Sequence, residues 1–470
     1  MTSTVELPLW LFVLILLFAA VTFASHFLFP SVRWFVRRRL ERAVDRLNRR
    51  LERPIQPFKL ARRHDMIQRL VYNPAVSQAI VDHASAEGIP ENVAFEQAKR
   101  YAREIVPSFS TLAYYGFAIR IARFLGNSLY RVRLGNLDED GIKSIDPHAT
   151  VVFVMNHRSN MDYVLVTYLA AQRAALSYAV GEWAQVWPLS RLIRAMGAYF
   201  IRRKSRNELY RRVLACYIRL ATGAGVTQAI FPEGGLSLSG ELMPPRMGLL
   251  KYLTDAADPA ERDIVFVPVA LNYDRVLEDS ILIAADQGRE RRFNARIGLV
   301  GRRILHQFWL RITGRFHRFG YAAVSFGHPV SLRAFRARRS GDITTPLAGF
   351  LMQRIGEIVP VLPVPLVSWL LLNHGAMTRA EIVEGMDRAA LSVPHAHVHV
   401  PRHDRDYAAE VGLRNLAERG MIEQVGDRFA PCESGMALLR FYANSIRHLM
   451  PPAALAGSAG AKGVSAPAGS

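Results

Sequence analysis

Residues 150–163 read Thr-Val-Val-Phe-Val-Met-Asn-His-Arg-Ser-Asn-Met-Asp-Tyr, and this stretch decides the fold. Thr150–Met155 is a run of β-branched and apolar residues, which predicts a strand buried on both faces of a sheet. Polar residues follow directly, at the carboxyl end of the predicted strand, where open α/β sheets bind their ligands. From Met161 onward the pattern becomes helical, so Asp162 is expected in the first turn of a helix.

His157 and Asp162 are five residues apart and would not share a face of one continuous helix. A histidine in the loop and an aspartate in the first turn can still meet, and the carboxylate would then orient the imidazole as a general base. The alternative is a loop histidine with a structural role, followed by an acid that the helix dipole favours. This stretch alone leaves both interpretations open.

The composition favours a protein of more than one domain that binds something acidic. The chain has 470 residues, half of them hydrophobic, and can bury a sizeable core. Its formal net charge of +20 is compatible with nucleic acid, anionic lipid or phosphorylated substrates as partners. The only two cysteines, Cys216 and Cys432, suggest neither a disulfide framework nor a cysteine-based zinc site.

An apolar segment near the N-terminus, Leu7–Phe29, predicts a single transmembrane anchor over residues 1–30. The residues before it carry no positive side chain, which argues against a cleaved signal peptide. Arginines are frequent in residues 33–50, and the positive-inside rule then places the catalytic part on the cytoplasmic side of the inner (plasma) membrane. The arginines have the spacing of an amphipathic helix, which either lies on anionic lipid or is an ordinary solvated helix.

Helical patterns continue through residues 31–128, and strand-like and helical segments alternate over residues 129–340. Three more polar segments follow apolar runs there: Arg202–Lys204, Pro232–Gly240 and Asn272–Arg275. Arginines suit bidentate binding of phosphate, and glycines beside a carboxylate allow the backbone to approach a ligand closely. The second segment is neither a Walker A loop nor a nucleophile elbow. Four such loops predict one site on an α/β fold with a mixed sheet covered by helices.

Residues 341–450 predict a smaller C-terminal domain that resembles a winged helix. A capping box at Thr378–Glu381 begins one helix, and Gly426–Asp427 is the expected turn of a hairpin. This order of elements makes nucleic-acid binding a rival function. Because the basic residues are spread along the chain, a docking domain is favoured and no nucleic-acid partner is expected.

No catalytic or metal-binding role is expected for two features near the end of the chain. His395, His397 and His399 alternate with apolar residues, which predicts three imidazoles on one strand face. No carboxylate or cysteine accompanies them, so no metal site is expected. Residues 451–470 are rich in Ala, Gly, Ser and Pro, which is typical of a disordered tail.

The four polar segments resemble the four ordered blocks of the glycerolipid acyltransferase superfamily, most closely those of bacterial membrane-bound glycerol-3-phosphate 1-O-acyltransferases. The matching residues are the His-x4-Asp of His157 and Asp162, the Phe-Ile-Arg-Arg block Gly197–Arg203, the Phe-Pro-Glu-Gly-Gly block Phe231–Gly235, and Val267–Val269 followed by Tyr273. The order of the blocks makes the resemblance specific at the level of the superfamily. It extends over most of the chain, from about residue 70 to about residue 450.

The resemblance implies the glycerolipid acyltransferase fold and acyl transfer from acyl-CoA or acyl-carrier protein to the sn-1 hydroxyl of glycerol 3-phosphate, the first step of phospholipid biosynthesis. No cofactor and no metal are implied. His157 would be the general base and Asp162 would fix its tautomer. The implied substrate-binding residues are Phe200, Ile201, Arg202, Arg203, Glu233, Gly234, Ser237 and Arg246.

One departure from the family pattern leaves the acceptor open. The third block of the glycerol-3-phosphate enzymes usually carries two arginines where this chain has Leu236 and Leu238. A related acyltransferase that uses a lysophospholipid or another acceptor is therefore the alternative. A non-enzymatic basic protein that binds membranes or nucleic acid, with an inert His-Asp pair, is a third possibility.

Overall fold

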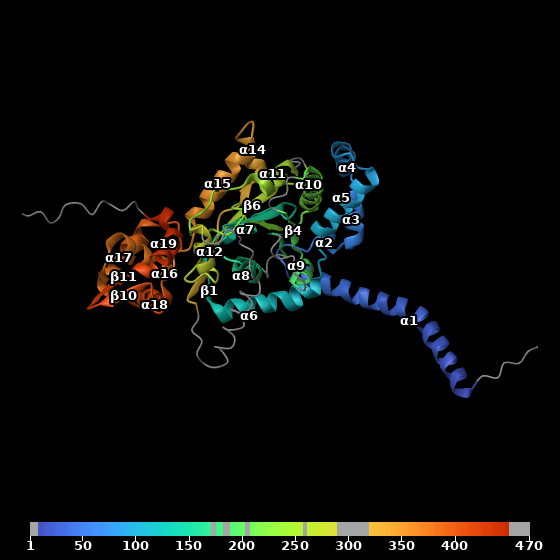
Figure 1. Ribbon diagram of the computed structural model, residues 1–470, viewed down its shortest axis with the longest axis horizontal. Helices are drawn as coiled ribbons and strands as arrows, with labels where there is room; N and C mark the ends of the chain where they lie inside the picture. The colour runs from blue at the N-terminus through green and yellow to red at the C-terminus, as the bar shows by residue number, and fades with distance from the viewer. Residues whose placement is uncertain are drawn as a thin grey trace, which may run out of the picture. The chain divides into compact units, whose positions relative to one another are not determined.

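The computed structural model describes residues 8–170, 175–181, 189–202, 207–256, 261–288 and 319–450 (Figure 1). The chain divides into a unit made up mainly of Met1–Pro54 and a larger unit that begins at Ile55. The predicted tail over residues 451–470 lies outside the described residues.

The first unit consists mainly of one helix, α1 (Leu9–Asn48), which runs without a break through residue 30. Except for the partly exposed Leu11, its described apolar side chains between Leu9 and Val21 are exposed, for example Trp10 at 65% and Phe18 at 73%. Within the part of the chain that is described, no helix is long and apolar enough to cross a membrane, so the anchor expected over Leu7–Phe29 is not found there. Residues 1–7 and the side chains of residues 23–37 are outside the description.

The helical region predicted up to residue 128 is confirmed. Its elements are α2 (Pro57–Leu60), α3 (Arg63–Val71), α4 (Pro74–Glu87), α5 (Glu91–Ile105), the π-helix η1 (Leu112–Ala118) and α6 (Ile119–Leu129). Helix α4 illustrates the local signals: the Asn73 side chain accepts a hydrogen bond from the Ala75 N–H at 3.1 Å, and Gly88 ends the helix with a φ of 61°.

The α/β region contains an eight-stranded mixed sheet with the order β1-β7-β6-β2-β5-β3-β4, in which β8 also pairs with β6. The strands are β1 (Arg131–Leu137), β2 (Thr150–Met155), β3 (Ser177–Gly181), β4 (Tyr199–Ile201), β5 (Gln228–Ile230), β6 (Ile264–Tyr273), β7 (Tyr321–Phe326) and β8 (Val330–Ser331). β6, β2, β5, β3 and β4 are parallel, whereas β7 and β8 run antiparallel to β6. The mixed sheet predicted from the sequence is therefore confirmed.

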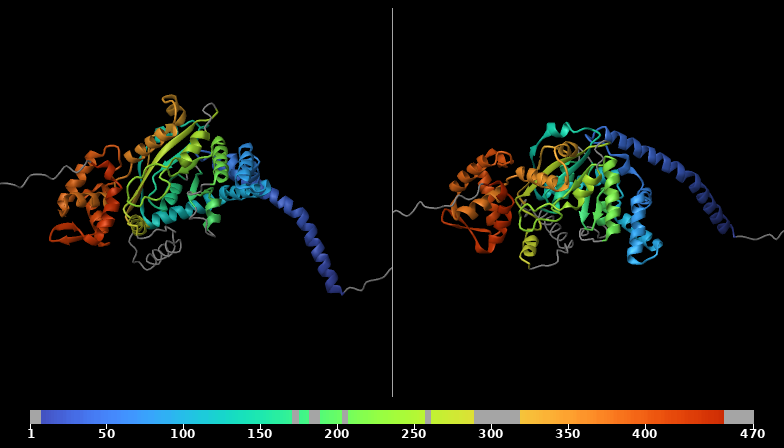
Figure 2. Two further views of the ribbon diagram at one scale, coloured as in Figure 1. Left: turned by 45° about the horizontal axis from the view of Figure 1, so that its top comes forward. Right: turned by 90° about the horizontal axis from the view of Figure 1, so that it is seen from above.

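Helices cover this sheet, as Figure 2 shows from two directions. They are α7 (Glu139–Lys143), α8 (Met161–Ala170), α9 (Leu189–Ala195), α10 (Glu208–Gly223), α11 (Met247–Ala256), α12 (Asp279–Asp286), α14 (Leu332–Ala337) and α15 (Thr344–Glu357). All residues of β2, β6 and β7 are buried, which explains why these strands read as continuous apolar runs. The core of the larger unit lies around these central strands.

The C-terminal region contains helices and a three-stranded sheet. Its elements are α16 (Pro363–His374), β9 (Met377–Thr378), α17 (Arg379–Ser392), η3 (Pro401–His403), α18 (Arg405–Ala417), β10 (Ile422–Val425), β11 (Arg428–Pro431), η4 (Glu433–Gly435), α19 (Met436–Asn444) and η5 (Arg447–Leu449). The capping box of Thr378 with Glu381 and the antiparallel hairpin of β10 and β11 are both as predicted.

The strand predicted for His395, His397 and His399 is wrong. This segment makes only an isolated parallel bridge, between Val398 and Val361. His399 packs against Tyr321, with 4.4 Å between the ring centroids, and burial lowers the pKa of its imidazole to about 4. The alternation therefore reflects packing of a loop against β7 instead of a strand face.

Candidate active site

The sheet brings the predicted blocks together at one edge. β2 lies between β5 and β6 and is parallel to both, so the segments that follow these three strands leave the sheet on the same side. Asn156 fixes the end of β2, because its side chain exchanges two hydrogen bonds with the backbone of Leu271 in β6, at 2.8 and 3.0 Å. The loop that carries His157 is thereby held against the neighbouring strand.

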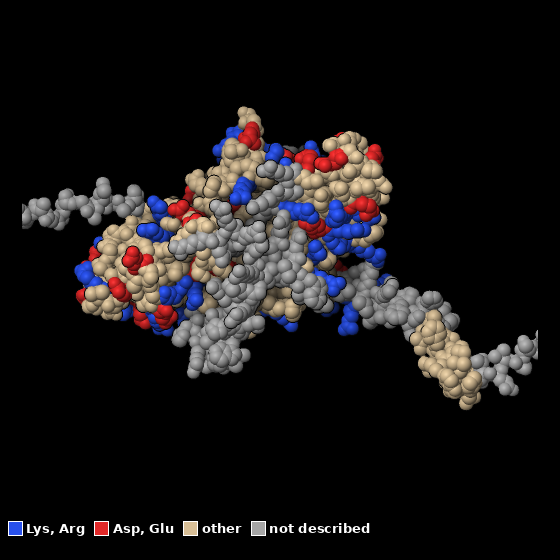
Figure 3. Space-filling model, in the orientation of Figure 1, with Lys and Arg blue, Asp and Glu red and all other residues tan. Residues whose placement is uncertain are grey.

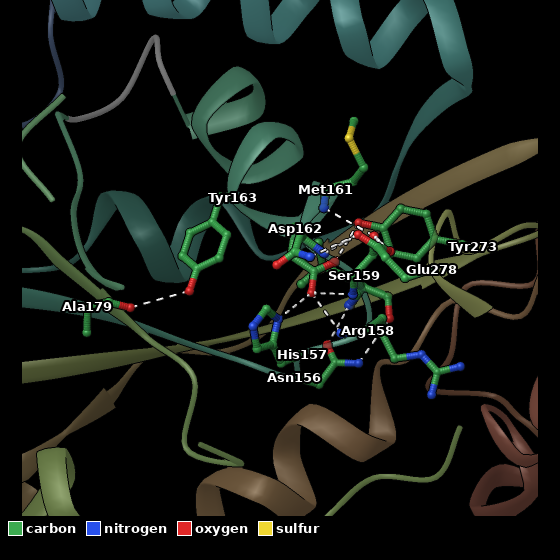
Figure 4. A network of polar contacts seen from close by, with 12 residues as sticks. Asn156, His157, Arg158, Ser159, Met161, Asp162, Tyr163, Ala179, Tyr273 and Glu278 are labelled. Atoms are coloured by element: carbon green, nitrogen blue, oxygen red, sulfur yellow. Dashed lines mark hydrogen bonds and ion pairs between the residues drawn. The ribbon is translucent and has the colours of Figure 1, made fainter. Parts of the chain in front are cut away.

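His157 and Asp162 meet as the sequence suggested, in a pair that Figure 4 shows from close by. The distance from His157 Nδ1 to Asp162 Oδ2 is 2.9 Å, and both side chains are buried. The His157 ring stacks on Phe231 at 4.0 Å between centroids and meets the Tyr163 ring edge-on at 5.6 Å. These aromatic neighbours lower the local polarity, so the ion pair formed by a protonated imidazole would be strong.

The Asp162 carboxylate is held by three further donors. The backbone N–H groups of Arg158 and Ser159 donate to Oδ2 at 2.7 and 3.0 Å. The Tyr273 hydroxyl donates to Oδ1 at 2.5 Å (Figure 4). A buried carboxylate with this many donors can rotate very little. Tyr273 therefore belongs to the site, although it was not among the site residues expected from the sequence.

Glu278 braces the loop between His157 and Asp162. Its carboxylate accepts a hydrogen bond from Ser159 Oγ at 2.7 Å and another from Asn160 Nδ2 at 3.0 Å. Glu278 is buried, and burial raises the pKa of its carboxyl. Nothing in the sequence singled it out, because its contact depends on how β6 and α12 place residues more than a hundred positions from the loop.

The third block lies against the first. The Ser237 N–H donates to the His157 carbonyl at 3.0 Å, and Ser237 Oγ donates to the Glu241 carbonyl at 2.6 Å. Gly234 has a φ of 69°, which favours glycine, and a Cβ there would lie 2.7 Å from the Arg246 side chain and would displace it. Glu233 is buried, and burial raises the pKa of its carboxyl to about 8, against the opposing influence of the Arg158 charge.

Arg158 connects this loop to the last helix of the C-terminal region. Its Nη1 donates to the Gly240 carbonyl, and its guanidinium lies 5.6 Å from the centroid of the Phe441 ring in α19. Gly240 touches the same residue, since a Cβ there would lie 2.0 Å from the Phe441 carbonyl oxygen. The Asn444 side chain donates to the Ser239 carbonyl at 2.9 Å. Helix α19 therefore supports both the first and the third block.

An open cavity of about 330 Å³ lies on the Phe231 side of His157. Four of the predicted substrate-binding residues line it: Ile201, Arg202, Gly234 and Arg246. Arg211, which no sequence motif indicated, lines it as well. Phe200 does not line it but is buried in β4. Arg203 lies outside the described residues.

A second cavity, of about 230 Å³, lies on the Tyr163 side. Its lining is almost entirely apolar and comes from η1, α6, α8, β3 and α9, with Tyr163, Ile121, Leu125, Val164, Val180 and Ile193 among the contributors. Asn160, from the loop that Glu278 braces, also lines it. Of the two aromatic rings that contact His157, Phe231 thus lines the cavity that contains arginines and Tyr163 lines the apolar one.

The described residues contain no cluster of His, Cys, Asp and Glu side chains that could hold a metal ion. Cys216 is buried in α10 and Cys432 is partly buried, and neither lines the two cavities. The described site combines a His-Asp pair with a cavity that contains arginines and an apolar cavity nearby.

Two protein families match parts of this chain. Residues 137–272 match the Acyltransferase family, and residues 309–462 match the family described as the glycerol-3-phosphate acyltransferase C-terminal region. The first match contains the first three blocks and Val267–Val269 of the fourth. These matches confirm the resemblance to the glycerolipid acyltransferases that the blocks indicate.

Curated relatives make the likeness more specific. The chain is 27% identical to the glycerol-3-phosphate acyltransferase of Pseudomonas putida (strain W619) over 430 residues, and 27% identical to that of Shewanella loihica over 420 residues. These matches cover 84% and 83% of the chain, respectively, but the chain spans only about half the length of either relative. A solved structure, the 1-acyl-sn-glycerophosphate acyltransferase of Thermotoga maritima, shares 15% identity, with 60% of this chain and 91% of that one covered, at a TM-score of 0.33.

Proposed function

We propose that this protein transfers an acyl group from a thioester, acyl-CoA or acyl-carrier protein, to the sn-1 hydroxyl of glycerol 3-phosphate. The observation that carries the proposal is the buried His157–Asp162 pair, 2.9 Å apart, whose ring neighbours Phe231 and Tyr163 line an arginine-lined and an apolar cavity, respectively. An acyl chain requires an apolar site, and a phosphorylated acceptor requires a cationic one. The names of the relatives support the same reaction.

In the proposed reaction, His157 removes the proton from the acceptor hydroxyl as its oxygen attacks the thioester carbonyl carbon. The new C–O bond forms, the C–S bond of the tetrahedral intermediate breaks, and His157 returns the proton to the leaving thiolate. Asp162, which contacts Nδ1, keeps the other ring nitrogen available as the base and stabilises the imidazolium that forms. No acyl-enzyme is required.

The acyl chain of the donor would occupy the apolar cavity, and the phosphate of the acceptor would occupy the arginine-lined one. Glu233 is protonated at neutral pH because burial raises its pKa to about 8, so it could bind a glycerol hydroxyl without repelling the phosphate. Phe231 stacks on His157 and also lines the proposed acceptor cavity.

We also propose that the protein works at a membrane surface. Exposed apolar side chains of α1 would contact the lipid. In the larger unit, Lys and Arg side chains gather over α2, α3 and α5 (Figure 3), where Arg62, Arg69, Arg100 and Arg103 are exposed, and they would attract anionic headgroups. Flotation with vesicles of phosphatidylcholine, with and without phosphatidylglycerol, tests this, and Phe18→Glu should weaken binding. Extraction at alkaline pH separates a membrane span from surface attachment.

The test of activity offers labelled palmitoyl-CoA or palmitoyl-acyl-carrier protein to the purified protein with a panel of acceptors. We expect 1-acylglycerol 3-phosphate from glycerol 3-phosphate, and a loss of about 10²–10⁴-fold in kcat for His157→Ala. Product only with lysophospholipids would support the alternative that Leu236 and Leu238 raise. No product with any acceptor, or full activity of His157→Ala, would refute the proposal.

A further inference from the structure

The arginine-lined cavity contains a basic residue outside the four blocks, Arg211, in the first turn of α10. We propose that Arg211 acts with Arg246 to bind the phosphate of the acceptor, and that Arg202 chiefly holds the wall of the cavity in place. This inference rests on the proposed function, because it assigns the phosphate contacts within the same site.

The charge of Arg202 is already matched by a carboxylate. Its Nε lies 2.9 and 3.2 Å from the two oxygens of Glu104, and its Nη2 lies 2.6 Å from one of them. The guanidinium also lies over the rings of Tyr101 and Tyr210. A bidentate pair of this kind is close to neutral as seen by a third ion, so Arg202 adds little attraction for a phosphate. It ties the end of β4 to α5 instead.

Arg246 reaches the cavity from the loop that follows the third block. Its N–H donates to the Pro232 carbonyl at 2.8 Å, and its side chain packs against Gly234. It directly precedes α11, whose first residues, including Gly248 and Leu249, also line the cavity. The first N–H groups of a helix have no acceptor within the helix and favour an anion, so Arg246 and the start of α11 act in the same direction.

Arg211 lines the cavity from α10. Its guanidinium is 3.9 Å from the Glu208 carboxylate, an exposed ion pair within one helix, in contrast to the close bidentate contact between Arg202 and Glu104. The positive charge of Arg211 acts on Tyr252. Burial raises the pKa of the Tyr252 hydroxyl, and the Arg211 charge is the largest influence that lowers it. Tyr252 also lines the cavity.

Together these contacts describe a site for a phosphate monoester dianion. The guanidinium groups of Arg211 and Arg246 and the first residues of α11 line the space. Phe231 also lines it and stacks on His157. Neither Leu236 nor Leu238 is among the described residues that line this space, so their lack of charge does not remove its cationic character. The site therefore suits a small phosphorylated acceptor.

The chain offers a matched control for the test. Arg211 and Arg212 are adjacent, both are about half exposed or more, and each loses one positive charge on substitution, but only Arg211 lines the cavity. For Arg211→Ala we expect a KM for glycerol 3-phosphate about 5–30-fold higher, with kcat and the KM for palmitoyl-CoA within about twofold of the wild type. Arg212→Ala should have a KM for glycerol 3-phosphate close to that of the wild type. Arg211→Lys should restore part of the affinity, and inorganic phosphate should inhibit Arg211→Ala more weakly.

Three outcomes would overturn the inference. They are equal KM values for Arg211→Ala and Arg212→Ala, an increase confined to the KM for palmitoyl-CoA, and unchanged inhibition by phosphate. Calorimetric titration of glycerol 3-phosphate into the same three proteins gives the answer without turnover. If the wild type binds glycerol 3-phosphate and Arg211→Ala does not, but neither forms product, the proposed function fails while the phosphate site stands.

Discussion

Replacing Asp162 by asparagine separates the charge of the site from its geometry. The Asp162 Oδ2 atom accepts three of the four hydrogen bonds, from His157, Arg158 and Ser159, and an amide oxygen in its place can accept all three. The amide nitrogen would then face the Tyr273 hydroxyl, which can rotate and accept instead of donating. Asp162→Asn should therefore keep the loop in place and remove only the negative charge.

The expected loss follows from the electrostatics of the pair. In the transition state the imidazolium of His157 would face the carboxylate, with about 4 Å between the centres of charge, which corresponds to about 4 kcal/mol at an effective dielectric constant of about 20. Without that stabilisation the barrier rises by the same amount, and about 1.4 kcal/mol corresponds to a tenfold change in rate. We expect kcat to fall about 10³-fold, with KM values little changed because the two cavities are untouched.

The assay is the initial rate of palmitoyl transfer from labelled palmitoyl-CoA to glycerol 3-phosphate, measured beside thermal unfolding. Asp286→Asn, the same change at an exposed position of α12, is the control and should behave as the wild type. The free energy of unfolding of Asp162→Asn should stay within about 2 kcal/mol of the wild type. A variant that folds normally and keeps more than a tenth of the wild-type kcat would show that the Asp162 charge does not stabilise a His157 imidazolium in the transition state.

Three further outcomes are expected. Tyr273→Phe removes one of the hydrogen bonds that orient Asp162, so kcat should fall about 5–30-fold, and a wild-type rate would contradict that role. Because burial raises the pKa of Glu233 to about 8, the folded protein holds a proton that the unfolded chain releases near its usual pKa, and stability should fall as the pH rises from about 4.5 to 8. Glu233→Gln should flatten that decline, as thermal unfolding at pH 5 and pH 8.5 will test. Leu125→Trp should fill part of the apolar cavity and lower the ratio of palmitoyl-CoA to lauroyl-CoA kcat/KM about tenfold, and an unchanged ratio would place the acyl chain elsewhere.

Local patterns in the sequence were sufficient for the central strands and for the His-Asp pair. Thr150–Met155 is a strand over the predicted residues, because burial on both faces leaves no position for a polar side chain. His157 and Asp162 meet because a short loop followed by the first turn of α8 places them together. Both features depend on residues close together in the chain.

Other features depend on contacts that no local pattern encodes. The hydrogen bond from Tyr273 to Asp162 joins residues 111 positions apart and exists only because β6 pairs with β2. Glu278 and Arg211 lie outside the blocks and acquire their places from α12 and α10. The alternation of histidines at 395–399 resembled a strand, but packing against Tyr321 explains it without one.

The contacts of α19 with the third block bear on how the protein can be divided. A chain cut after residue 340 would retain every residue of the four blocks. Its sequence would still match the Acyltransferase family over residues 137–272. It would lack Phe441 and Asn444, so Arg158 and the Ser239 carbonyl would lose partners that hold them now, and Gly240 would lose its contact with the Phe441 backbone. Such a fragment should be open to proteolysis near residue 240 and inactive, and adding the separate 341–450 segment should restore protection before it restores turnover. In this chain helix α19 is a structural component of the candidate active site.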